Sequence, residues 1–496
     1  MKHFLSCLLL LFAAPSPPVS EPPLDQAALR AHIQYLADDA LQGRKPGTVG
    51  GDEAAHYIAR QFHAIGLEPG AKGGNWYQPV ALVERIPRLS QQLWYAKDHP
   101  LRLEPSQIQL SARDGHLAFS KADVIFAGYA LDAPRAGFDD LRNVDVRGKV
   151  VLILSGRPEG VNAPGLEVRR EAVARAGAVA VIALTGSSDP WEIIREQLDR
   201  GRTSLAEAVS APLQGALSYA GWSDLFAAAG ADAQKLVTAA GTPGFRAIPL
   251  ALQLDATATT TVRPFTSANV VARLAGNDRP DEAVLFLAHW DHLGICRPAG
   301  VPDRICNGAV DNASGVALLI EVARRLASGP RPHRSIYFVA TTAEELGLLG
   351  SHVLAEDPPV SRDHVAAAFN FDTVAIVPAG EPVATIGAGY TKLDPLIAAA
   401  ARAQGRNLDE SGAANAFLTR QDGWELLKAG IPAVMIGGAY ADGARLAAFL
   451  SGNYHHPSDD LAHLLPLDGA AEDGALDVVL GRMAADPMIL PLPSRH

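Results

Sequence analysis

Two segments of the sequence place metal-binding side chains where a buried strand is expected to end. His289 follows the apolar run 283–287, and Asp311 opens the segment Asp311-Asn312-Ala313-Ser314-Gly315. An apolar run bounded by polar residues predicts a buried strand. Open α/β sheets bind ligands just beyond the carboxyl ends of their strands. We therefore predict that His289 and Asp311 are ligands of a metal centre.

The later chain supplies further ligands at similar places. Glu344 and Glu345 follow one predicted strand, Asp372 follows the next, and His455 lies in a histidine-rich loop. Two histidines and three acids suit two borderline ions such as zinc. Two cations a few ångströms apart need a bridging carboxylate to offset their repulsion, and Asp311 is the candidate.

These motifs, taken in order, resemble the secreted co-catalytic zinc aminopeptidases, the bacterial leucine-aminopeptidase-like metallopeptidases. Many members of that family carry an inserted protease-associated domain. The resemblance is carried by five ordered motifs: His289-x-Asp291, Asp311-Asn312-Ala313-Ser314-Gly315, Glu344-Glu345, Asp372 and Tyr454-His455-x-Pro457-x-Asp459.

The resemblance implies how the ligands are divided between two zinc ions. Asp311 would bridge both ions. Glu345 and His455 would complete one site, and His289 and Asp372 would complete the other. His292 and His456 compete with His289 and His455 for these places, and the family pattern favours the first histidine of each pair.

The resemblance also implies three catalytic roles. Glu344 would be the general base. Asp291 would orient His289, because the His-x-Asp spacing lets the carboxylate accept the imidazole N–H. Tyr454 would donate to the oxygen of the tetrahedral intermediate, or else it only packs beside its neighbour. Where the family often has Arg-Ser-Asp, this chain has Arg420-Gln421-Asp422, a change that bears on the substrate pocket.

Length and composition limit the other possibilities. The chain has 496 residues and a net charge of −11, with 48% hydrophobic and 20% charged residues. This length predicts two domains plus extra segments, and the negative charge argues against a nucleic-acid partner. Residues 1–20 have a basic start followed by a short apolar stretch, which predicts a signal peptide and export to the periplasm or the extracellular space. No run approaches the roughly 20 apolar residues of a stable membrane span.

Cys296 and Cys306 flank a short loop between the first two ligands. In an oxidising compartment they can form a disulfide that closes this loop. The alternative is that one of them is a thiolate ligand. Neither lies in a Cys-x-x-Cys pair, so we favour the disulfide.

The periodicity of the chain predicts an α/β fold, a mixed β-sheet sandwiched by helices, with a small β-rich domain inserted in it. Residues 24–70 predict two scaffold helices joined by a surface loop over 42–47, the second ending at Gly66. We place the domains at 24–122 (catalytic, first part), 123–261 (protease-associated insertion) and 262–496 (catalytic, second part).

The function expected from these observations is removal of N-terminal residues from peptide substrates. A carboxypeptidase of the same fold, like glutamate carboxypeptidase, needs cationic residues around a substrate carboxylate, and Arg420 alone does not make that case. A glutaminyl cyclase is a weaker alternative, because those enzymes keep one metal. A receptor-like protein without catalysis is the alternative from another class, and intact ligands argue against it.

Overall fold

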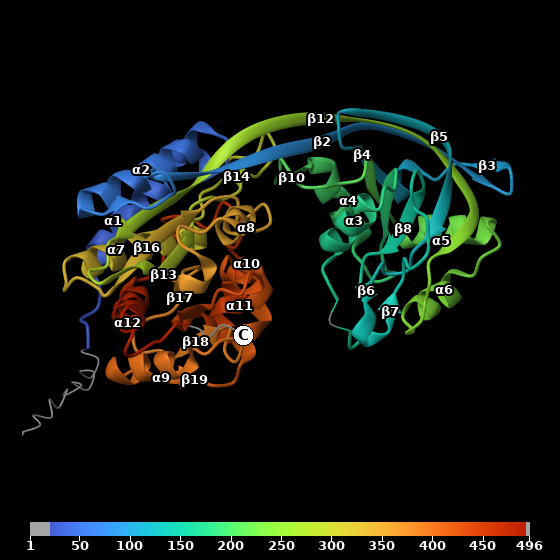
Figure 1. Cartoon of the computed structure of the whole chain (residues 1–496). Coiled ribbons are helices and arrows are strands. Elements are labelled where there is room, and N and C mark those ends of the chain that lie inside the picture. The colour runs from blue at the N-terminus through green and yellow to red at the C-terminus, as the bar shows by residue number, and fades with distance from the viewer. Residues whose placement is uncertain (1–19, 162, 493–496) are drawn as a thin grey trace, which may run out of the picture. The chain divides into compact units, whose positions relative to one another are not determined.

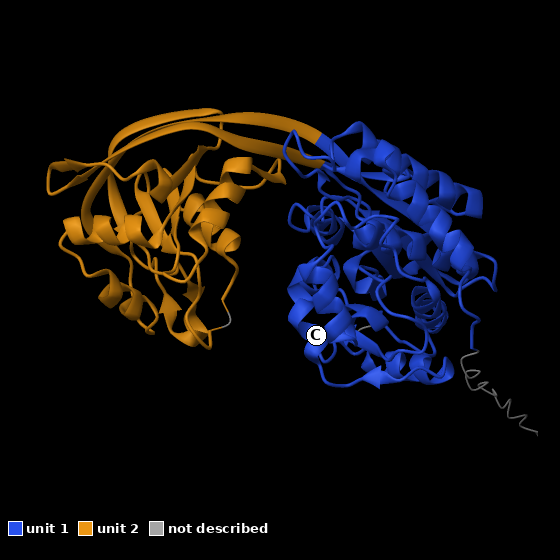
Figure 2. Cartoon of the chain, turned by 180° about the vertical axis from the view of Figure 1, so that it is seen from behind, with its two compact units in different colours: residues 1–80, 266–496 blue, residues 81–265 orange. Residues whose placement is uncertain are grey.

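The structure, a computed structural model, describes residues 20–161 and 163–492. It divides into two compact units, unit 1 (residues 1–80 and 266–496) and unit 2 (residues 81–265), which Figure 2 colours separately. The chain leaves unit 1 along strand β2 (Tyr77–Ala96) and returns along β12 (Ile248–Leu274). The predicted signal peptide lies outside the described residues except for Ser20. Within the described residues, no helix is both long enough and apolar enough to cross a bilayer.

Unit 1 contains a mixed sheet with helices on both faces, as Figure 1 shows. Its strands run in the order β19-β18-β20-β17-β13-β16-β12, and the central four, β20, β17, β13 and β16, are parallel. Besides β2 and β12, its strands are β1 (Glu68–Pro69), β13 (Arg279–His289), β14 (Gly294–Ile295), β15 (Ile305–Cys306), β16 (Arg334–Thr341), β17 (Val365–Asn370), β18 (Val383–Ile386), β19 (Leu408–Asp409) and β20 (Ala433–Gly437). The predicted fold class is therefore confirmed.

The helices of unit 1 come from both ends of the chain. The longer ones are α1 (Gln26–Leu36), α2 (Val49–Ile65), α7 (Gly315–Ala327), α8 (Leu349–Glu356), α9 (Asp394–Ala403), α10 (Gly423–Lys428), α11 (Gly443–Ser451) and α12 (Asp468–Ala484). Short helical turns are η1 (Asp39–Arg44), η4 (Ala309–Ser314), η5 (Arg362–His364), η6 (Ala413–Arg420) and η7 (Gly438–Tyr440).

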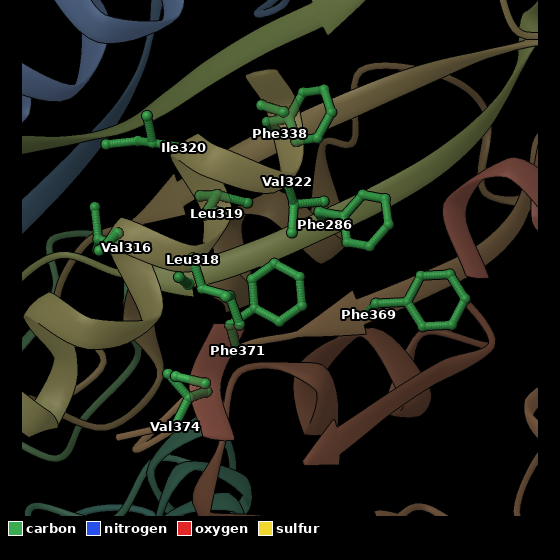
Figure 3. Close-up of a cluster of buried hydrophobic side chains, with 14 of the residues drawn as sticks. Phe286, Val316, Leu318, Leu319, Ile320, Val322, Phe338, Phe369, Phe371 and Val374 are labelled. Carbon is green, nitrogen blue, oxygen red and sulfur yellow. The ribbon is translucent and has the colours of Figure 1, made fainter. Parts of the chain in front are cut away.

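Alternating residues of the central strands explain why both faces are covered. Phe286 of β13 packs against Phe338 of β16 and Phe369 of β17. The same cluster contains side chains of α7, as Figure 3 shows. Leu285 and Leu287 point to the opposite face, in a second cluster with residues of α8 and α10. A strand buried on both faces reads as a continuous apolar run, which is the pattern that precedes His289.

The two N-terminal helices form as their end signals predict. The Asp25 side chain accepts the Ala27 N–H at the start of α1, and Thr48 accepts the Gly51 N–H at the start of α2. Gly66 ends α2 with φ of 91°, a left-handed conformation that glycine adopts without a Cβ clash. The apolar stripes of both helices are buried in the main core of unit 1.

Unit 2 has its own hydrophobic core. Its strands are β3 (His99–Leu101), β4 (Ile108–Ala112), β5 (His116–Phe126), β6 (Asp132–Ala133), β7 (Phe138–Asp139), β8 (Val150–Leu154), β9 (Ala180–Leu184), β10 (Arg202–Leu205) and β11 (Leu213–Leu217). Its helices are α3 (Leu166–Arg175), α4 (Trp191–Arg200), α5 (Tyr219–Ala228) and α6 (Ala233–Ala240), with the short turns η2 (Pro105–Gln107) and η3 (Pro134–Ala136). The core contains Trp94, Phe126 and Trp222.

Unit 2 starts earlier than the insertion predicted at 123–261. It begins at Ala81, because residues 82–85 of β2 pair with β10 and because Trp94 lies in its core. Its assignment as a protease-associated domain stays a prediction.

Candidate metal centre

The ends of three parallel strands bring the predicted ligands together. His289 is the last residue of β13, and it pairs in register with Thr341, the last residue of β16. Glu344 and Glu345 come a few residues after Thr341, and Asp372 comes shortly after the end of β17. Parallel neighbours end at the same edge of a sheet, so these side chains share one edge.

One group of donors contains His289, Asp311 and Asp372. One ligand atom from each lies within 4.8 Å of the others. The Nε2 atom of His289 is 3.3 Å from Asp311 Oδ1 and 3.7 Å from Asp372 Oδ1. These are the three residues expected at the first zinc site.

A second group shares Asp311 with the first. His455 Nε2 is 3.0 Å from Glu345 Oε2 and 3.4 Å from Asp311 Oδ2. His292, Asp311 and Glu345 also offer ligand atoms within 4.8 Å of one another. The structure thus brings together all five predicted ligands, with Asp311 between the two groups, and it adds His292.

The hydrogen bonds at this edge leave the metal-facing atoms free. Among the described residues, the buried atoms His289 Nε2, His455 Nε2 and Glu345 Oε1 have no hydrogen-bond partner. His289 Nδ1 lies 3.1 Å from the Asp291 carbonyl oxygen, which can only accept, so Nδ1 carries a proton and Nε2 is the nitrogen available to a metal ion. Unpartnered buried polar atoms are costly, and a bound metal ion would satisfy them.

The Asp291 side chain has a different contact from the predicted one. Its Oδ1 atom is 3.9 Å from His289 Nδ1, too far for a hydrogen bond, and the backbone carbonyl of Asp291 takes that place. Instead, Oδ1 accepts the backbone N–H of Glu344 at 3.1 Å. Asp291 therefore links the His289 loop to the Glu344 loop.

Burial and opposing charges set the ionisation of these groups. Burial opposes protonation of His289, but Glu344 and the neighbouring Asp311 and Asp372 outweigh it and hold the His289 pKa well above its usual value. Burial would raise the pKa of Asp311, but His289 and His455 hold it well below the usual range. Burial raises the pKa of Glu344 well above that of an exposed carboxyl group. A carboxylate with a raised pKa is suited to accept a proton near neutral pH.

The backbone is strained beside three of these residues. Ala343, Thr373 and His455 have φ values of 56°, 55° and 60°, in the left-handed region that residues with a Cβ rarely adopt. Such residues persist where the surrounding structure requires them, and they concentrate at functional sites.

Arg44 is buried beneath the cluster, contrary to the prediction of a surface loop over 42–47. Its guanidinium donates to the carbonyl oxygens of Leu36, Trp290, Asn307 and Gly308. It thereby joins the chain next to His289 to the chain that leads into Asp311. Burial lowers the Arg44 pKa to about 10, and nearby carboxylates, Asp459 first, act in the opposite direction. The side chain stays charged at neutral pH.

Asp459 holds the segment around Asp311 through the backbone N–H groups of that segment. Its two carboxylate oxygens accept the backbone N–H groups of Val310 and Asp311 at 2.8 and 3.0 Å. Asp311 is thus fixed in two ways. The Arg44 cation binds carbonyl groups that precede Asp311, and the Asp459 carboxylate binds the backbone N–H of Asp311 itself.

A pocket opens beside the cluster. It combines carboxylates with apolar and aromatic side chains, and Arg420 is the cationic residue among those that line it. The lining residues are Asp311, Glu344, Asp372, Thr373, Phe417, Arg420, Gln421, Met435, Tyr440, Leu446, Leu450 and Tyr454. Gln421, at the position where the family often has serine, is buried and its side-chain oxygen accepts the Gly423 N–H.

Tyr454 lies between the pocket and its neighbouring ligand. Its ring stacks on His455 with centroids 3.7 Å apart and meets the edge of Phe449 at 5.9 Å. Burial raises its pKa above that of free tyrosine, so the hydroxyl keeps its proton. The residue therefore packs and also offers a donor.

Cys296 and Cys306 form a disulfide, as favoured from the sequence. It closes the hairpin of β14 and β15, in which Gly294 pairs with Cys306. The Cys306 sulfur is 3.5 Å from the carbonyl oxygen of His455. The hairpin is therefore a brace beside a predicted ligand, and neither sulfur is a thiolate ligand.

Sequence reasoning assigned no role at the metal centre to several residues that the structure places there. Arg44, Asp422 and Tyr440 come from distant segments; the Asp422 carboxylate accepts the Thr341 hydroxyl, and the Tyr440 hydroxyl donates to the Asp372 carbonyl. Asp422 and Tyr440 are not at the ends of the strands used to find the ligands, so their spacing gave no signal. His292 was visible only as a competitor of His289.

Comparisons with known proteins agree with this geometry. Residues 269–476 match the family model described as peptidase family M28. A probable zinc metalloprotease of Pyrenophora teres f. teres is 38% identical over 114 residues, which are 22% of this chain and 23% of that protein. Aminopeptidase NAALADL1 of Mus musculus is 37% identical over 97 residues, 18% of this chain and 11% of that protein. The matched segment spans less than a quarter of the length of each relative.

The fold also matches a solved structure. The aminopeptidase from Aneurinibacillus sp. strain AM-1 aligns over 92% of this chain and 94% of its own, with a TM-score of 0.52 and 20% identity. The α/β fold is that of the matched structure, and the carboxylate–imidazole cluster offers the donors of a metal site. The match to peptidase family M28 covers residues 269–476, which is less than half of the chain.

Proposed function

We propose that the protein is a dinuclear zinc aminopeptidase that removes N-terminal residues from peptides. The observation that carries the proposal is the place of Asp311 in both donor groups, which is what a carboxylate bridging two ions requires. The donors are imidazoles and carboxylates, the set from which zinc sites are commonly built.

The residues of the chain have separate tasks in this reaction. When bound, the two zinc ions would acidify the attacking water and polarise the scissile carbonyl group. Glu344 takes the proton of that water and passes it to the leaving amine. Asp291, through the Glu344 N–H, holds the loop that carries this base. The Tyr454 hydroxyl donates a hydrogen bond to the oxygen of the tetrahedral intermediate.

The charge of the pocket favours a free N-terminus over a C-terminus. Asp311, Glu344 and Asp372 line it, and Arg420 is exposed at its side. The zinc ions would offset the charges of Asp311 and Asp372, so Glu344 is the carboxylate left to attract the ammonium group of a peptide. Apolar residues such as Phe417 and Leu446 lie beside these carboxylates and offer contacts to an apolar side chain.

Hydrolysis of amino-acyl p-nitroanilides tests the proposal. We expect cleavage of substrates with a free amine, loss of activity with a chelator, and recovery with added zinc. N-acetylated substrates that are otherwise identical should not be hydrolysed. Cleavage of C-terminally free but N-acetylated peptides would instead favour the carboxypeptidase that Arg420 suggests. An absence of hydrolysis with every metal tested would contradict the proposal that the protein is an enzyme.

Replacement of Glu344 tests the division of roles. Glu344→Gln removes the base but keeps the size of the side chain, so we expect kcat to fall by about 1,000-fold. The zinc content should stay near that of the unaltered protein, as measured by atomic emission. If zinc is lost instead, Glu344 is a ligand and the roles of the two adjacent glutamates are reversed.

We also propose that the protein is exported. The support is the sequence of residues 1–20 and the disulfide between Cys296 and Cys306, a bond typical of oxidising compartments. Fractionation of cells that express the full chain, with N-terminal sequencing of the product, tests this. A product in the cytoplasm that still begins at Met1 would contradict it.

A further inference from the structure

His292 is a third histidine at the cluster, and its side chain is fully buried. Its ring meets the His455 ring edge to face, with centroids 5.7 Å apart. On its other side lies Gly308, where an added Cβ would come within 2.7 Å of the His292 ring. The chain therefore leaves room for this imidazole directly beside the loop that carries Asp311.

Within the part of the chain that the structure describes, neither ring nitrogen of His292 has a hydrogen-bond partner. A buried imidazole without partners costs free energy, because it loses its hydrogen bonds to water. His32, which is buried among helices of the same unit, shows the usual solution: its nitrogens lie 2.7 Å from the Tyr57 hydroxyl and 3.0 Å from Glu321. His292 therefore lacks the contacts that a purely structural histidine makes.

A carboxylate oxygen of a predicted ligand lies close to His292. Its Nδ1 atom is 2.5 Å from Glu345 Oε1, yet the two groups are not aligned as a hydrogen bond. Two atoms with lone pairs repel each other at this distance unless a cation lies between them. Glu345 Oε2 meanwhile faces His455 Nε2 at 3.0 Å, so Glu345 lies between the two imidazoles.

We propose that His292 is a ligand of the second metal ion, together with Asp311, Glu345 and His455. This inference rests on the two-ion site of the proposed function. Two imidazoles and two carboxylates form a complete four-ligand zinc set. The first site has only one imidazole, His289. Because imidazole suits zinc better than it suits magnesium or calcium, the second site would hold zinc more tightly and fill first.

A pair of substitutions separates a ligand from a hydrogen-bond donor. His292→Gln keeps a donor to Glu345 but is a poor zinc ligand, whereas His292→Asp offers a ligand and no donor. His456→Gln is the matched control, because His456 is the exposed neighbour of His455 and its Nδ1 contacts the Tyr454 carbonyl. Each full-length variant is stripped of metal and titrated with zinc against a competing chelator.

We expect His292→Gln to lower the zinc affinity of the tighter site by more than about 100-fold, beyond the effect typical of a residue that only supports a ligand. His292→Asp should stay within about 10-fold of the unaltered protein, and His456→Gln should match it. X-ray absorption of the unaltered zinc protein should show three imidazoles shared between two ions, and His292→Gln should show two.

The opposite order overturns the inference. If His292→Gln binds zinc normally and His292→Asp does not, a proton rather than a metal lies between His292 and Glu345. Circular dichroism shows whether each variant is folded, and the imidazole count of the unaltered protein decides the question if one is not. One zinc ion per unaltered chain would contradict the two-ion function separately, and the imidazoles around that ion would still show whether His292 binds it.

Discussion

At the scale of single residues, the fit to a metal ion depends less on the residue types than on which ring nitrogens and carboxylate oxygens face the ion's position. The Asp291 carbonyl fixes a proton of His289 on Nδ1, so Nε2 is the nitrogen that faces Asp311 and Asp372. A His-x-Asp pattern predicts a carboxylate in that place. The backbone oxygen serves as well, and it leaves the Asp291 carboxylate available to hold Glu344.

Tyr454 can be tested separately from the ligand that it stacks on. Tyr454→Phe keeps the ring on His455 and removes only the hydroxyl. We expect kcat to fall by about 100-fold with KM little changed, because the donor acts on charge that develops in the transition state. Steady-state kinetics on one p-nitroanilide substrate measures this. An unchanged kcat would show that the residue only packs.

The sequence predicted the residues at strand ends because a parallel sheet gathers such ends at one edge. That rule found His289, Glu344, Glu345 and Asp372 from local pattern alone. His455 was found in a histidine-rich loop, and the choice of His455 over His456 came from the resemblance to a family. His292 was set aside, because a sequence shows that two histidines are near each other but not which ring nitrogens lack partners.

At the scale of elements, the cluster depends on one turn far away in the sequence. Arg44, at the end of η1, ties the segment after β13 to the segment before η4. This turn looked like a surface connection because arginine and glycine are common there. The identity of its four acceptors, all backbone carbonyl groups, cannot be read from side-chain patterns.

Arg44→Lys keeps the charge and removes the planar set of donors. We expect zinc affinity to fall by about 10- to 100-fold, as for other residues that position ligands, with a loss of thermal stability. Arg60→Lys is the matched control, because that arginine is exposed and pairs with Glu53. Chelator competition measures the affinity. An Arg44→Lys protein that is less stable but binds zinc normally would limit Arg44 to a structural role.

The helices and strands of unit 1 were predicted well, and the boundary of unit 2 was not. Strong apolar periods mark α2, α7 and β13, whereas β2 has a mixed pattern over its 20 residues. Strand β2 begins in unit 1 and ends in unit 2, and its composition does not change at the boundary between them. Only its pairing with β10 shows where unit 2 begins.

At the scale of the whole molecule, the two units have separate hydrophobic cores. The main core of unit 1 contains Phe286 and Phe338, and that of unit 2 contains Trp94 and Trp222. All predicted metal ligands belong to unit 1. A ligand that binds only the folded state stabilises the part that it binds.

Calorimetry of the full chain should therefore show two unfolding transitions, of which only one responds to zinc. Removal of zinc with a chelator should lower the midpoint of that transition; saturation at 100 times the dissociation constant is worth about 2.7 kcal/mol. Hydrogen exchange followed by mass spectrometry assigns each transition to its residues. A shift of both transitions together would show that the units unfold as one.

The order of the chain has a consequence for biosynthesis. Helices α1 and α2 and the turn with Arg44 leave the ribosome before unit 2, but the strands that they cover are made after it. Domains fold as units during synthesis, and a helix as short as the 11 residues of α1 is marginal alone. Unit 2 is thus the first part able to fold, while the N-terminal helices wait for their partners. The cluster, whose last donor is His455, is completed only after unit 2 and the central strands of unit 1 have been made.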